Sequence, residues 1–476
     1  MKDNSSLKYS LHSVARLSFF SEKLPPRISL FFITIAVQLI ASGTAGAAFV
    51  LRSGRLWLLS TSIWTLWFVM LFLVVFPGTD KFLRSNPRHL NTLISMIFLA
   101  ILFCGILELI AFTAFFPRYL SSIPNQSLRS LVEELGNGFQ YTDGTALCHQ
   151  AVDNLLAGKN PYANPNITEA LQKYSVDSFR VTPLRTGAFA AIFPYPSRSQ
   201  LEQIEKSASQ DLSVPPEIET KFSYPAGSFL LPLPFITAGV RDLRWVYALF
   251  IIAGLICTTI LIPSQKRLLF IGACLISLEL WNSLAGGETS CLVFPLLLIA
   301  WITANRYKWI SLIFLGLAAA TKQTVWLFLP FYFILLYRRT DLKTTFSGLL
   351  VVAGIFALFN AYFILANPAL WIESILAPFI DPMFPLGVGL ITLVTSGMMP
   401  SIPPIFFTIL EAVIFLASII WYYFAGFKYP NSAVILAILP FFFGWRSLWS
   451  YFFYASIILL AGILCDNNQP AYSDAN

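Results

Sequence analysis

Apolar segments separated by short polar stretches dominate the pattern along this chain. Two of the apolar pieces, 225–239 and 386–398, are short and flanked by Pro or Gly, which is typical of re-entrant or half-spanning elements. Several of the other segments reach or exceed the length of about 20 residues with which a helix crosses a bilayer, and several are shorter, so that a few pairs could fuse or split. They lie at 28–51, 57–77, 91–116, 244–262, 268–284, 289–303, 308–321, 324–337, 343–366, 405–426, 432–444 and 447–464. The pattern predicts an all-α, polytopic integral membrane protein with about 12 transmembrane helices, in a range of about 10–14.

Composition supports this fold class. Hydrophobic residues make up 57% and charged residues 12% of the 476-residue chain, whereas soluble domains carry about 25% charged residues. This fraction of charged residues is too small to cover the surface of a water-soluble protein, so we do not expect a soluble protein. The formal charge of +7 fits Lys and Arg in cytoplasmic loops and not a nucleic-acid surface. The six cysteines show no metal-ligand spacing, which indicates small buried residues.

The distribution of Lys and Arg predicts the orientation in the membrane. Cytoplasmic loops are enriched in these residues, and the chain carries them in its N-terminal segment and at 78–90, 264–267, 305–308 and 337–343. Both termini are therefore expected in the cytoplasm, and the segment 28–51 is expected to be a retained first helix, since its apolar run is too long for a signal peptide.

The chain accordingly divides into five parts. These are a cytoplasmic segment (1–27), N-terminal transmembrane helices (28–116), a large extracytoplasmic loop (117–224), a transmembrane helical body (225–464) and a cytoplasmic tail (465–476). The segments expected outside, besides the large loop, are 285–288, 321–324, 367–404 and 444–446. We expect a multi-pass protein of the cell membrane whose functional site faces outside.

The large loop contains a polar island at 140–162 that carries the most specific candidate chemistry. Two short amphipathic helices are expected in the loop, at 125–135 and 145–157, and the apolar stripe of the second would let it lie flat on the membrane surface. Asp143 stands just before the second helix. It can cap that helix through a backbone N–H, or it can act as a general base at the membrane interface.

Further candidates lie on the same predicted side. Tyr162 follows a Gly-Lys-Asn-Pro turn, and helix capping accounts for the Gly and the Pro but not for the Tyr. Tyr224 stands where the loop re-enters the membrane. Glu288 precedes a helix, where the helix dipole favours an acid. These residues also extend the candidate site beyond Asp143.

Two cations outside the loop are candidates for holding a phosphate. Lys322 and Arg446 either extend to lipid headgroups or bind a phosphate, for which the arginine fork is better suited. The cations of the loop itself are Lys159, Arg180, Arg185 and Arg198, most of which are expected to be solvated. His149 and Asp153 share a helix face as a possible metal pair, but no third ligand is evident nearby.

The motifs described above, taken in their order along the chain, resemble those of GT-C glycosyltransferases. They are most similar to family 87, the polyprenol-phosphate-mannose-dependent mannosyltransferases, over roughly residues 91–340. Asp143 with its helix and the turn Gly158-x-x-Pro161-Tyr162 matches the first outer loop of that family. The matches continue with Tyr224-Pro225, where Ala226 replaces a second Pro, with Gly287-Glu288, where Gly-Gln is usual, and with Lys322. The helices 28–51 and 57–77 are additional.

The resemblance implies an inverting hexosyltransferase. It would move a mannose-like sugar from a polyprenyl-phosphate donor to a hydroxyl of a lipid or glycan acceptor on the outer face, with no cofactor or metal. Asp143 would be the catalytic base. Arg446 would steady the leaving phosphate, and Tyr162, Tyr224, Glu288 and Lys322 would contribute to substrate binding. A membrane transporter or lipid flippase is the alternative from another class, although paired inverted halves and mid-membrane charges are not evident. A non-catalytic membrane scaffold is the third.

Overall fold

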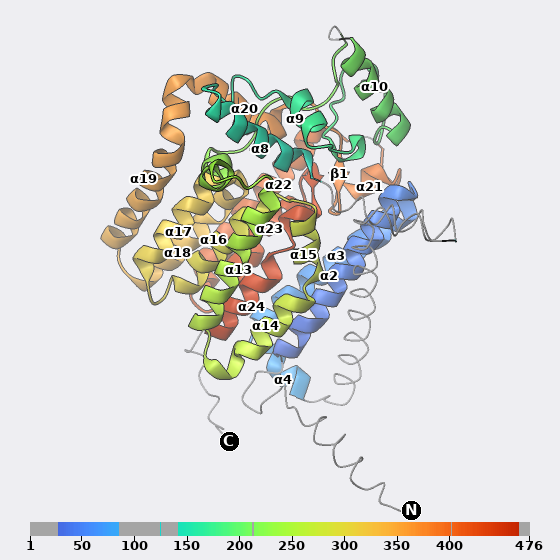
Figure 1. The fold of residues 1–476 in the computed structure, drawn as a ribbon. Helices are drawn as coiled ribbons and strands as arrows, with labels where there is room; N and C mark the ends of the chain where they lie inside the picture. The colour runs from blue at the N-terminus through green and yellow to red at the C-terminus, as the bar shows by residue number, and fades with distance from the viewer. Residues whose placement is uncertain (1–26, 85–123, 125–140, 212–213, 401, 466–476) are drawn as a thin grey trace, which may run out of the picture.

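The computed structural model describes residues 27–84, 124, 141–211, 214–400 and 402–465. This part of the chain is helical almost throughout (Figure 1). The helices that form the body are α2 (Arg27–Val50), α3 (Gly54–Val75), α13 (Leu243–Leu261), α14 (Arg267–Ile276), α15 (Leu278–Ala285), α16 (Ser290–Thr303), α17 (Lys308–Thr321), α18 (Leu329–Arg339), α19 (Leu342–Ala366), α22 (Pro404–Ala425), α23 (Ser432–Phe442) and α24 (Ala455–Cys465).

Shorter elements connect or cover these helices. The α-helices among them are α4 (Thr79–Arg84), α8 (Asp143–Leu156), α9 (Ile167–Lys173), α10 (Arg198–Gln210), α11 (Gly227–Leu230), α12 (Leu233–Thr237), α20 (Pro368–Ile380) and α21 (Thr392–Thr395). The 3-10 turns are η2 (Ser178–Arg180), η3 (Gly187–Phe189), η4 (Ser264–Lys266), η5 (Gln323–Leu327) and η6 (Trp449–Tyr451). Strands β1 (Leu386–Gly387) and β2 (Arg446–Ser447) pair in parallel, with Leu386 opposite Arg446. The described part is therefore all-α apart from this minimal pair.

Within the described residues, five helices are long and apolar enough to cross a membrane, namely α2, α3, α13, α19 and α22. A sixth span results if the segments Ser264–Ile276 and Leu278–Ala285, which meet at a bend of 50°, are counted as one. Only 17% of the most apolar stretch is buried in α19 and in α22, and large side chains such as Leu358 and Ile409 are exposed there. Apolar helices with an apolar outer face indicate a membrane protein, because water does not stabilise such a surface.

Helix α16 is the centre of the body. It is apolar on all sides, and nearly all of its residues are buried, as expected for a helix surrounded by other helices. It packs on α13, α17 and α24. Gly254 of α13 allows a close approach, because a Cβ at that position would lie 2.6 Å from the Cβ of Pro295. This packing fixes the position of the turn that precedes α16.

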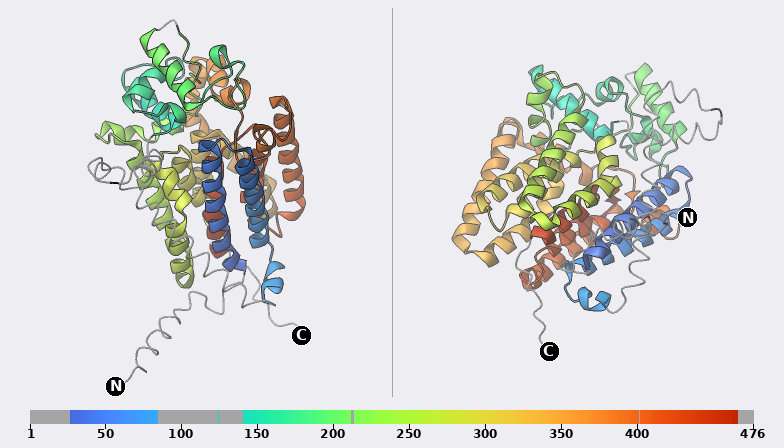
Figure 2. Two further views of the ribbon diagram at one scale, coloured as in Figure 1. Left: turned by 90° about the vertical axis from the view of Figure 1, so that its right-hand side faces the viewer. Right: turned by 60° about the horizontal axis from the view of Figure 1, so that its bottom comes forward.

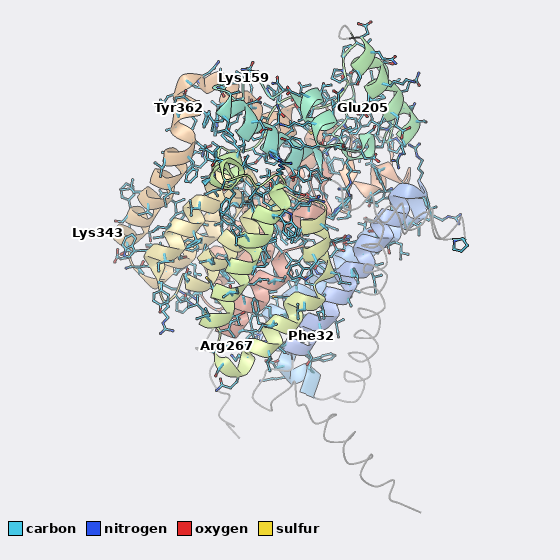
Figure 3. The ribbon with its side chains drawn as sticks, in the orientation of Figure 1. Phe32, Lys159, Glu205, Arg267, Lys343 and Tyr362 are labelled. Carbon is cyan, nitrogen blue, oxygen red and sulfur yellow. The ribbon has the colours of Figure 1, made fainter. Side chains whose placement is uncertain are left out.

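The body has two chemically different ends (Figures 1 and 2). The described parts of the loops expected in the cytoplasm lie at one end, where Arg27 pairs with Asp80 and the Lys266 ammonium donates to the Leu464 carbonyl at 3.3 Å. Helices α8, α9, α10 and α20 cover the other end (Figure 1). Lys159 and Arg267, labelled in Figure 3, lie at opposite ends. The polar elements of the large loop are thus held together at one end.

The predicted apolar segments within the described residues form helices, with several differences in detail. The segment 268–284 is broken at Ser277 into α14 and α15. The piece 225–239 forms the separate short helices α11 and α12, and 386–398 forms β1 and α21. In 447–464, the α-helix begins only at Ala455. The predicted segments 91–116 and 125–135 lie outside the described residues, so the total of about 12 spans stays a prediction.

Three helices of the polar end were not predicted, and one predicted environment was wrong. Helix α20 lies in the segment expected to be an outer loop, and α9 and α10 lie in the large loop. The helix predicted at 145–157 exists as α8, but its apolar stripe does not cover a membrane surface. Leu147 and Ala151 are buried, because α8 packs against α9 and α11. This helix is part of the protein core.

Candidate active site

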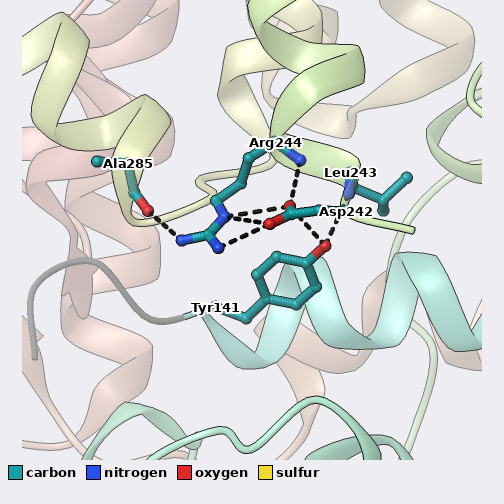
Figure 4. A network of polar contacts seen from close by, with 5 residues as sticks. All are labelled: Tyr141, Asp242, Leu243, Arg244 and Ala285. Atoms are coloured by element: carbon teal, nitrogen blue, oxygen red, sulfur yellow. Dashed lines mark hydrogen bonds and ion pairs between the residues drawn. The ribbon is translucent and has the colours of Figure 1, made fainter. Parts of the chain in front are cut away.

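The start of α8 is anchored by a polar network around Tyr141 (Figure 4). The Tyr141 hydroxyl donates to Asp242 Oδ1 at 2.8 Å and accepts from the Leu243 N–H at 2.7 Å. The Arg244 guanidinium donates to both Asp242 oxygens and, through Nη1, to the Ala285 carbonyl at 3.0 Å. This network joins the segment before α8, the start of α13 and the end of α15, and Tyr141 lies two residues before Asp143 in the chain.

Asp143 is the first residue of α8, and both of its carboxylate oxygens are hydrogen-bonded. Oδ1 accepts from the Gly144 N–H at 2.7 Å, and Oδ2 accepts from the Thr182 hydroxyl at 2.7 Å. The preceding Thr142 is the N-cap, and its hydroxyl accepts from the Thr145 N–H. Because Thr142 caps the helix, capping does not require Asp143, and its carboxylate is available for chemistry.

Burial and charge act in opposite directions on Asp143. Burial raises the pKa of its carboxyl above the ordinary value, whereas the hydrogen bonds from Thr182 and Gly144 and the charges of Arg446 and Arg180 lower this pKa. The net direction is upward. A general base is most effective when its pKa approaches the working pH, so this environment suits an acid that accepts a proton.

Tyr224 lies directly against the start of α8. A Cβ added to Gly144 would be 2.4 Å from the Tyr224 hydroxyl oxygen and 3.4 Å from Thr289 Cγ2. Glycine is therefore required at position 144 by this close approach, although its backbone is helical. Across the ring, the Lys322 ammonium lies 5.7 Å from the Tyr224 ring centroid, within the range of a cation–π contact.

Tyr162 is buried, with 3% of its surface exposed. Its hydroxyl donates to the backbone carbonyl of Tyr224 at 2.9 Å. Its ring contacts Phe222 and Phe363 edge to face, with both pairs of centroids 5.4 Å apart. The structure thus places Tyr162 behind Tyr224, where it holds the re-entry segment.

Lys322 and Glu288 are brought together with Arg180. The buried Lys322 ammonium donates to the hydroxyls of Thr289 at 2.8 Å and Ser290 at 2.7 Å. Glu288 lies in the turn between α15 and α16. Burial raises the pKa of its carboxyl, while the charges of Lys322 and Arg180 lower it. Two candidates expected from the sequence, Glu288 and Lys322, therefore share one local environment.

Arg180 ends η2 and is the loop cation that faces this cluster. Burial lowers the pKa of its guanidinium, and the charges of Glu288, Asp177 and Asp143 raise it. Other loop cations have different surroundings. Arg198 pairs with Asp177 and Glu202 on the outside of α10, and Lys159 is exposed. The sequence did not distinguish Arg180 from these residues, because its position depends on the fold of the loop.

Arg446 reaches the same region from β2. Its Nη1 donates to the Phe384 carbonyl at 3.3 Å, and the pairing with β1 fixes its backbone. Tyr195 packs on Phe384, with ring centroids 5.5 Å apart. Burial raises the pKa of the Tyr195 hydroxyl. The charge of Arg446 lowers this pKa, and the charge of Asp143 raises it. Tyr195 is therefore a further residue of the cluster, and nothing in the sequence pattern pointed to it.

The possible metal pair has other partners. Asp153 accepts from the Lys173 ammonium at 2.7 Å and from the Tyr174 hydroxyl, and His149 stacks on Tyr174 at 4.4 Å between ring centroids. Within the described residues, no group of three His, Cys, Asp or Glu side chains is arranged to hold a metal ion. The contacts of His149 and Asp153 are those of a structural pair that joins α8 to α9.

The candidate site thus combines one hydrogen-bonded carboxylate, a second acid, three cations and two tyrosines. They are Asp143, Glu288, Arg180, Lys322, Arg446, Tyr195 and Tyr224. A carboxylate can accept the proton of an attacking hydroxyl, and clustered cations can stabilise the developing charge of a leaving phosphate. No known protein family, curated protein or solved structure matches this chain.

Proposed function

We propose that this protein is a membrane glycosyltransferase that moves a mannose-like hexose from a polyprenyl-phosphate donor to an acceptor hydroxyl on a lipid or glycan. The observation that carries the proposal is the juxtaposition of Asp143 with Arg180 and Arg446. The carboxylate is held by Thr182 and Gly144, and the charges of both arginines act on it. Such a pairing of an acid with arginines fits a base that operates beside a phosphate leaving group.

In the proposed reaction, the acceptor hydroxyl oxygen attacks the anomeric carbon of the donor sugar. The new glycosidic bond forms on the face opposite the phosphate, and the bond between the anomeric carbon and the phosphate oxygen breaks. Asp143 takes the hydroxyl proton, and the bonding electrons leave with the polyprenyl phosphate. Arg446 and Arg180 stabilise that phosphate, because one guanidinium group can donate two parallel hydrogen bonds to two phosphate oxygens. The product is inverted at the anomeric carbon.

The remaining residues have supporting parts in this proposal. Tyr224 and Glu288 contact the sugar, Lys322 holds the turn at Thr289 through its ammonium, and Tyr162 positions Tyr224 through the hydrogen bond to its carbonyl. Tyr162 therefore acts through Tyr224 and does not touch the substrate. The apolar helices support a location in a membrane, for which we propose the cell membrane, and the distribution of Lys and Arg favours a site on the outer face.

The proposal is tested with membranes that contain the protein and a set of radiolabelled polyprenyl-phosphate hexoses. The expected result is label in an acceptor with polyprenyl-phosphate mannose, and none in membranes without the protein. Failure of all donors, together with movement of a labelled lipid across proteoliposomes that contain the purified protein, would contradict the enzyme and favour the flippase.

A further inference from the structure

Arg185 of the large loop is a cation that the proposed reaction does not use. Its side chain is half-buried, and its Nε atom is buried and makes no hydrogen bond with the described residues. Within the same part of the chain, its guanidinium forms no salt bridge. A buried donor without a partner is uncommon in folded proteins and calls for a physical explanation. An anion that accepts from this guanidinium would supply one.

The backbone around Arg185 is held between two other segments. Its N–H donates to the Pro382 carbonyl at 2.8 Å, and the N–H of Leu184 donates to the Glu217 carbonyl at 2.9 Å. Leu184 also forms a β-bridge with Met383. The side chain therefore extends from a backbone of fixed position, which reduces the entropy that is lost when a ligand binds.

Two aromatic rings contact the guanidinium of Arg185. Its central carbon lies 5.5 Å from the centroid of the Phe193 ring and 5.9 Å from that of the Phe384 ring, within the range of cation–π contacts. Phe193 is 38% exposed, whereas Phe384 is buried, so the guanidinium lies where the protein interior meets water. A guanidinium in contact with rings still carries N–H groups at its edge, which suit the two oxygens of a carboxylate or phosphate.

The carboxylates of the two flanking segments have other hydrogen-bond partners. The Thr186 hydroxyl donates to the Glu217 carboxylate. The Lys221 ammonium donates to both oxygens of Asp381 at 2.8 Å. Neither carboxylate forms a salt bridge with Arg185. The guanidinium donors are thus not taken up by the acids of the segments that hold its backbone.

Phe384 connects Arg185 to the candidate active site. The Arg446 guanidinium donates to the Phe384 carbonyl at 3.3 Å, and the Tyr195 ring packs on the Phe384 ring with centroids 5.5 Å apart. Arg185 and Arg446 therefore contact the same residue, one at its ring and the other at its carbonyl. A group bound by Arg185 would lie next to the site and not on a remote surface.

The surroundings of Arg185 favour the acceptor over the donor. The donor phosphate joins the sugar to a polyprenyl chain in the membrane, and it is assigned to Arg446 and Arg180, whose charges act on Asp143. Arg185 instead precedes the stretch 186–194, in which most residues are exposed. A group that reaches Arg185 from this side comes from the water, as expected of an acceptor glycan or headgroup.

We propose that Arg185 binds a carboxylate or phosphate group of the acceptor, so that the preferred acceptor is an anionic lipid or glycan. Nε and one terminal nitrogen of the guanidinium donate to the two oxygens of that group. This inference rests on the proposed sugar transfer for the identity of the bound molecule, and on the contacts of Arg185 for the charge of the bound group. Arg185 determines specificity and takes no part in the bond-making step.

A matched pair of synthetic glycolipids tests the proposal. Octyl glucuronide carries a carboxylate where octyl glucoside carries a hydroxymethyl group, and the two are otherwise identical. Their binding to the purified full-length protein in a nonionic detergent is measured by isothermal titration calorimetry. The test variant is Arg185→Gln, and the control is Lys159→Gln, which removes an exposed cation from the same loop. Arg185→Lys keeps the charge without the paired donors and serves if the Gln variant does not fold.

Octyl glucuronide is expected to bind the natural protein and the Lys159 variant more tightly than octyl glucoside. This preference should fall by roughly tenfold or more in Arg185→Gln and by less in Arg185→Lys. Equal binding of the two glycosides to the natural protein would overturn the proposal. An equal loss of preference in the Lys159 variant would also overturn it, because it would show a general effect of loop charge.

Two further measurements separate this site from donor binding and from the transfer reaction. Farnesyl phosphate, a short polyprenyl phosphate, should bind Arg185→Gln as tightly as the natural protein. Weaker binding would assign Arg185 to the donor and overturn the acceptor assignment. If no polyprenyl-phosphate hexose supports transfer while the preference for the glucuronide still depends on Arg185, the proposed function is contradicted and the anion site is supported.

Discussion

The hydroxyl of Tyr162 donates a hydrogen bond to the carbonyl of Tyr224, 62 positions further along the chain. This bond joins the turn after α8 to the point where the loop re-enters the body. The amide of Ala226 is fixed by Asn360 Oδ1 at 2.7 Å, and the Ser223 carbonyl by the Gln323 amide at 2.8 Å. The re-entry segment is thereby attached to the turn after α8, to α19 and to η5, so the Tyr224 side chain has a fixed position beside Asp143.

Replacement of Asp143 by Asn should abolish sugar transfer and leave expression intact. Asn keeps the size of the side chain but cannot take a proton, and general base catalysis typically contributes about 10²–10⁴ in rate. The measurement is initial-rate transfer in membranes with equal protein content. Full activity in this variant would remove Asp143 as the base.

Replacement of Thr182 by Val should shift the pH dependence of transfer. The Thr182 hydroxyl lowers the pKa of Asp143, so its loss raises this pKa further. The carboxylate form of Asp143 then predominates only at a higher pH, so the acidic limb of the pH–rate profile shifts to higher pH. At neutral pH the rate should fall about tenfold, as for a lost hydrogen bond to a charged group. Thr182→Ser retains the hydroxyl and should restore the natural profile; an unshifted limb in the Val variant would count against Thr182 as a positioning residue.

Replacement of Gly144 by Ala should destabilise the fold, although Ala is the better helix former. The added Cβ would lie 2.4 Å from the Tyr224 hydroxyl oxygen, and overpacking of this kind costs roughly 1–3 kcal/mol. Adding Tyr224→Phe removes that oxygen and should recover part of the loss in a thermal unfolding measurement. Gly272→Ala is the control, because nothing lies within 4 Å of its Cβ position. Additive effects of the two changes would contradict the close approach.

Replacement of Arg446 by Ala should raise the KM for the donor more than the KM for the acceptor. Arg446 is proposed to bind the donor phosphate, and charge-assisted hydrogen bonds of this kind are worth about 1.5–3 kcal/mol. The measurement is steady-state kinetics with each substrate varied in turn. Lys159→Ala removes an exposed cation from the same end of the protein and should leave both constants unchanged. Equal increases for donor and acceptor in the Arg446 variant would argue against the phosphate role.

The stability of the protein should decrease as the pH rises from about 4.5 to about 7, through Glu219. Burial of this carboxyl and the nearby Asp381 raise its pKa from 4.5 to about 7, against the hydrogen bond from the Lys221 N–H. The folded state therefore holds a proton that the unfolded state releases in this interval, so its contribution to stability is lost as the pH rises.

Thermal unfolding of the Glu219→Gln variant should show a weaker decrease over the same interval. Glu202→Gln, on the exposed side of α10, is the control and should follow the natural protein. An identical pH dependence in the Glu219 variant and the natural protein would show that another group is responsible.

The apolar helices were predictable because length and composition determine them. The break at Ser277 was not predicted, since the few polar residues of the segment 268–284 do not themselves specify a bend, which depends on packing. Helix α20 was missed because it has only 13 residues and contains Pro378. Helix α10 carried a readable signal, since Ser197 and Gln200 form a capping box, but its polar sequence was interpreted as loop.

The residues of the candidate site were predictable only where a motif marks them. Asp143, Tyr224, Glu288 and Lys322 stand in recognisable local patterns, and the structure brings them together. Thr182 lies 39 positions from Asp143 in the chain, and no local pattern relates the two. Arg180 was one of several loop cations, and its burial follows from the fold of the loop. Contacts between distant segments are what the sequence pattern does not contain.

The contrast between α16, which is buried on all sides, and α22, which is mostly exposed to lipid, also limits how this protein can evolve. Every substitution in α16 meets three neighbouring helices at once, so descendants of the gene should retain the size of each side chain there. The outer face of α22 contacts fluid hydrocarbon, which accepts Leu, Ile, Val or Phe alike. Sequence divergence should therefore accumulate on the lipid-facing side of α22 and be slowest in α16, the helix that follows the turn with Glu288.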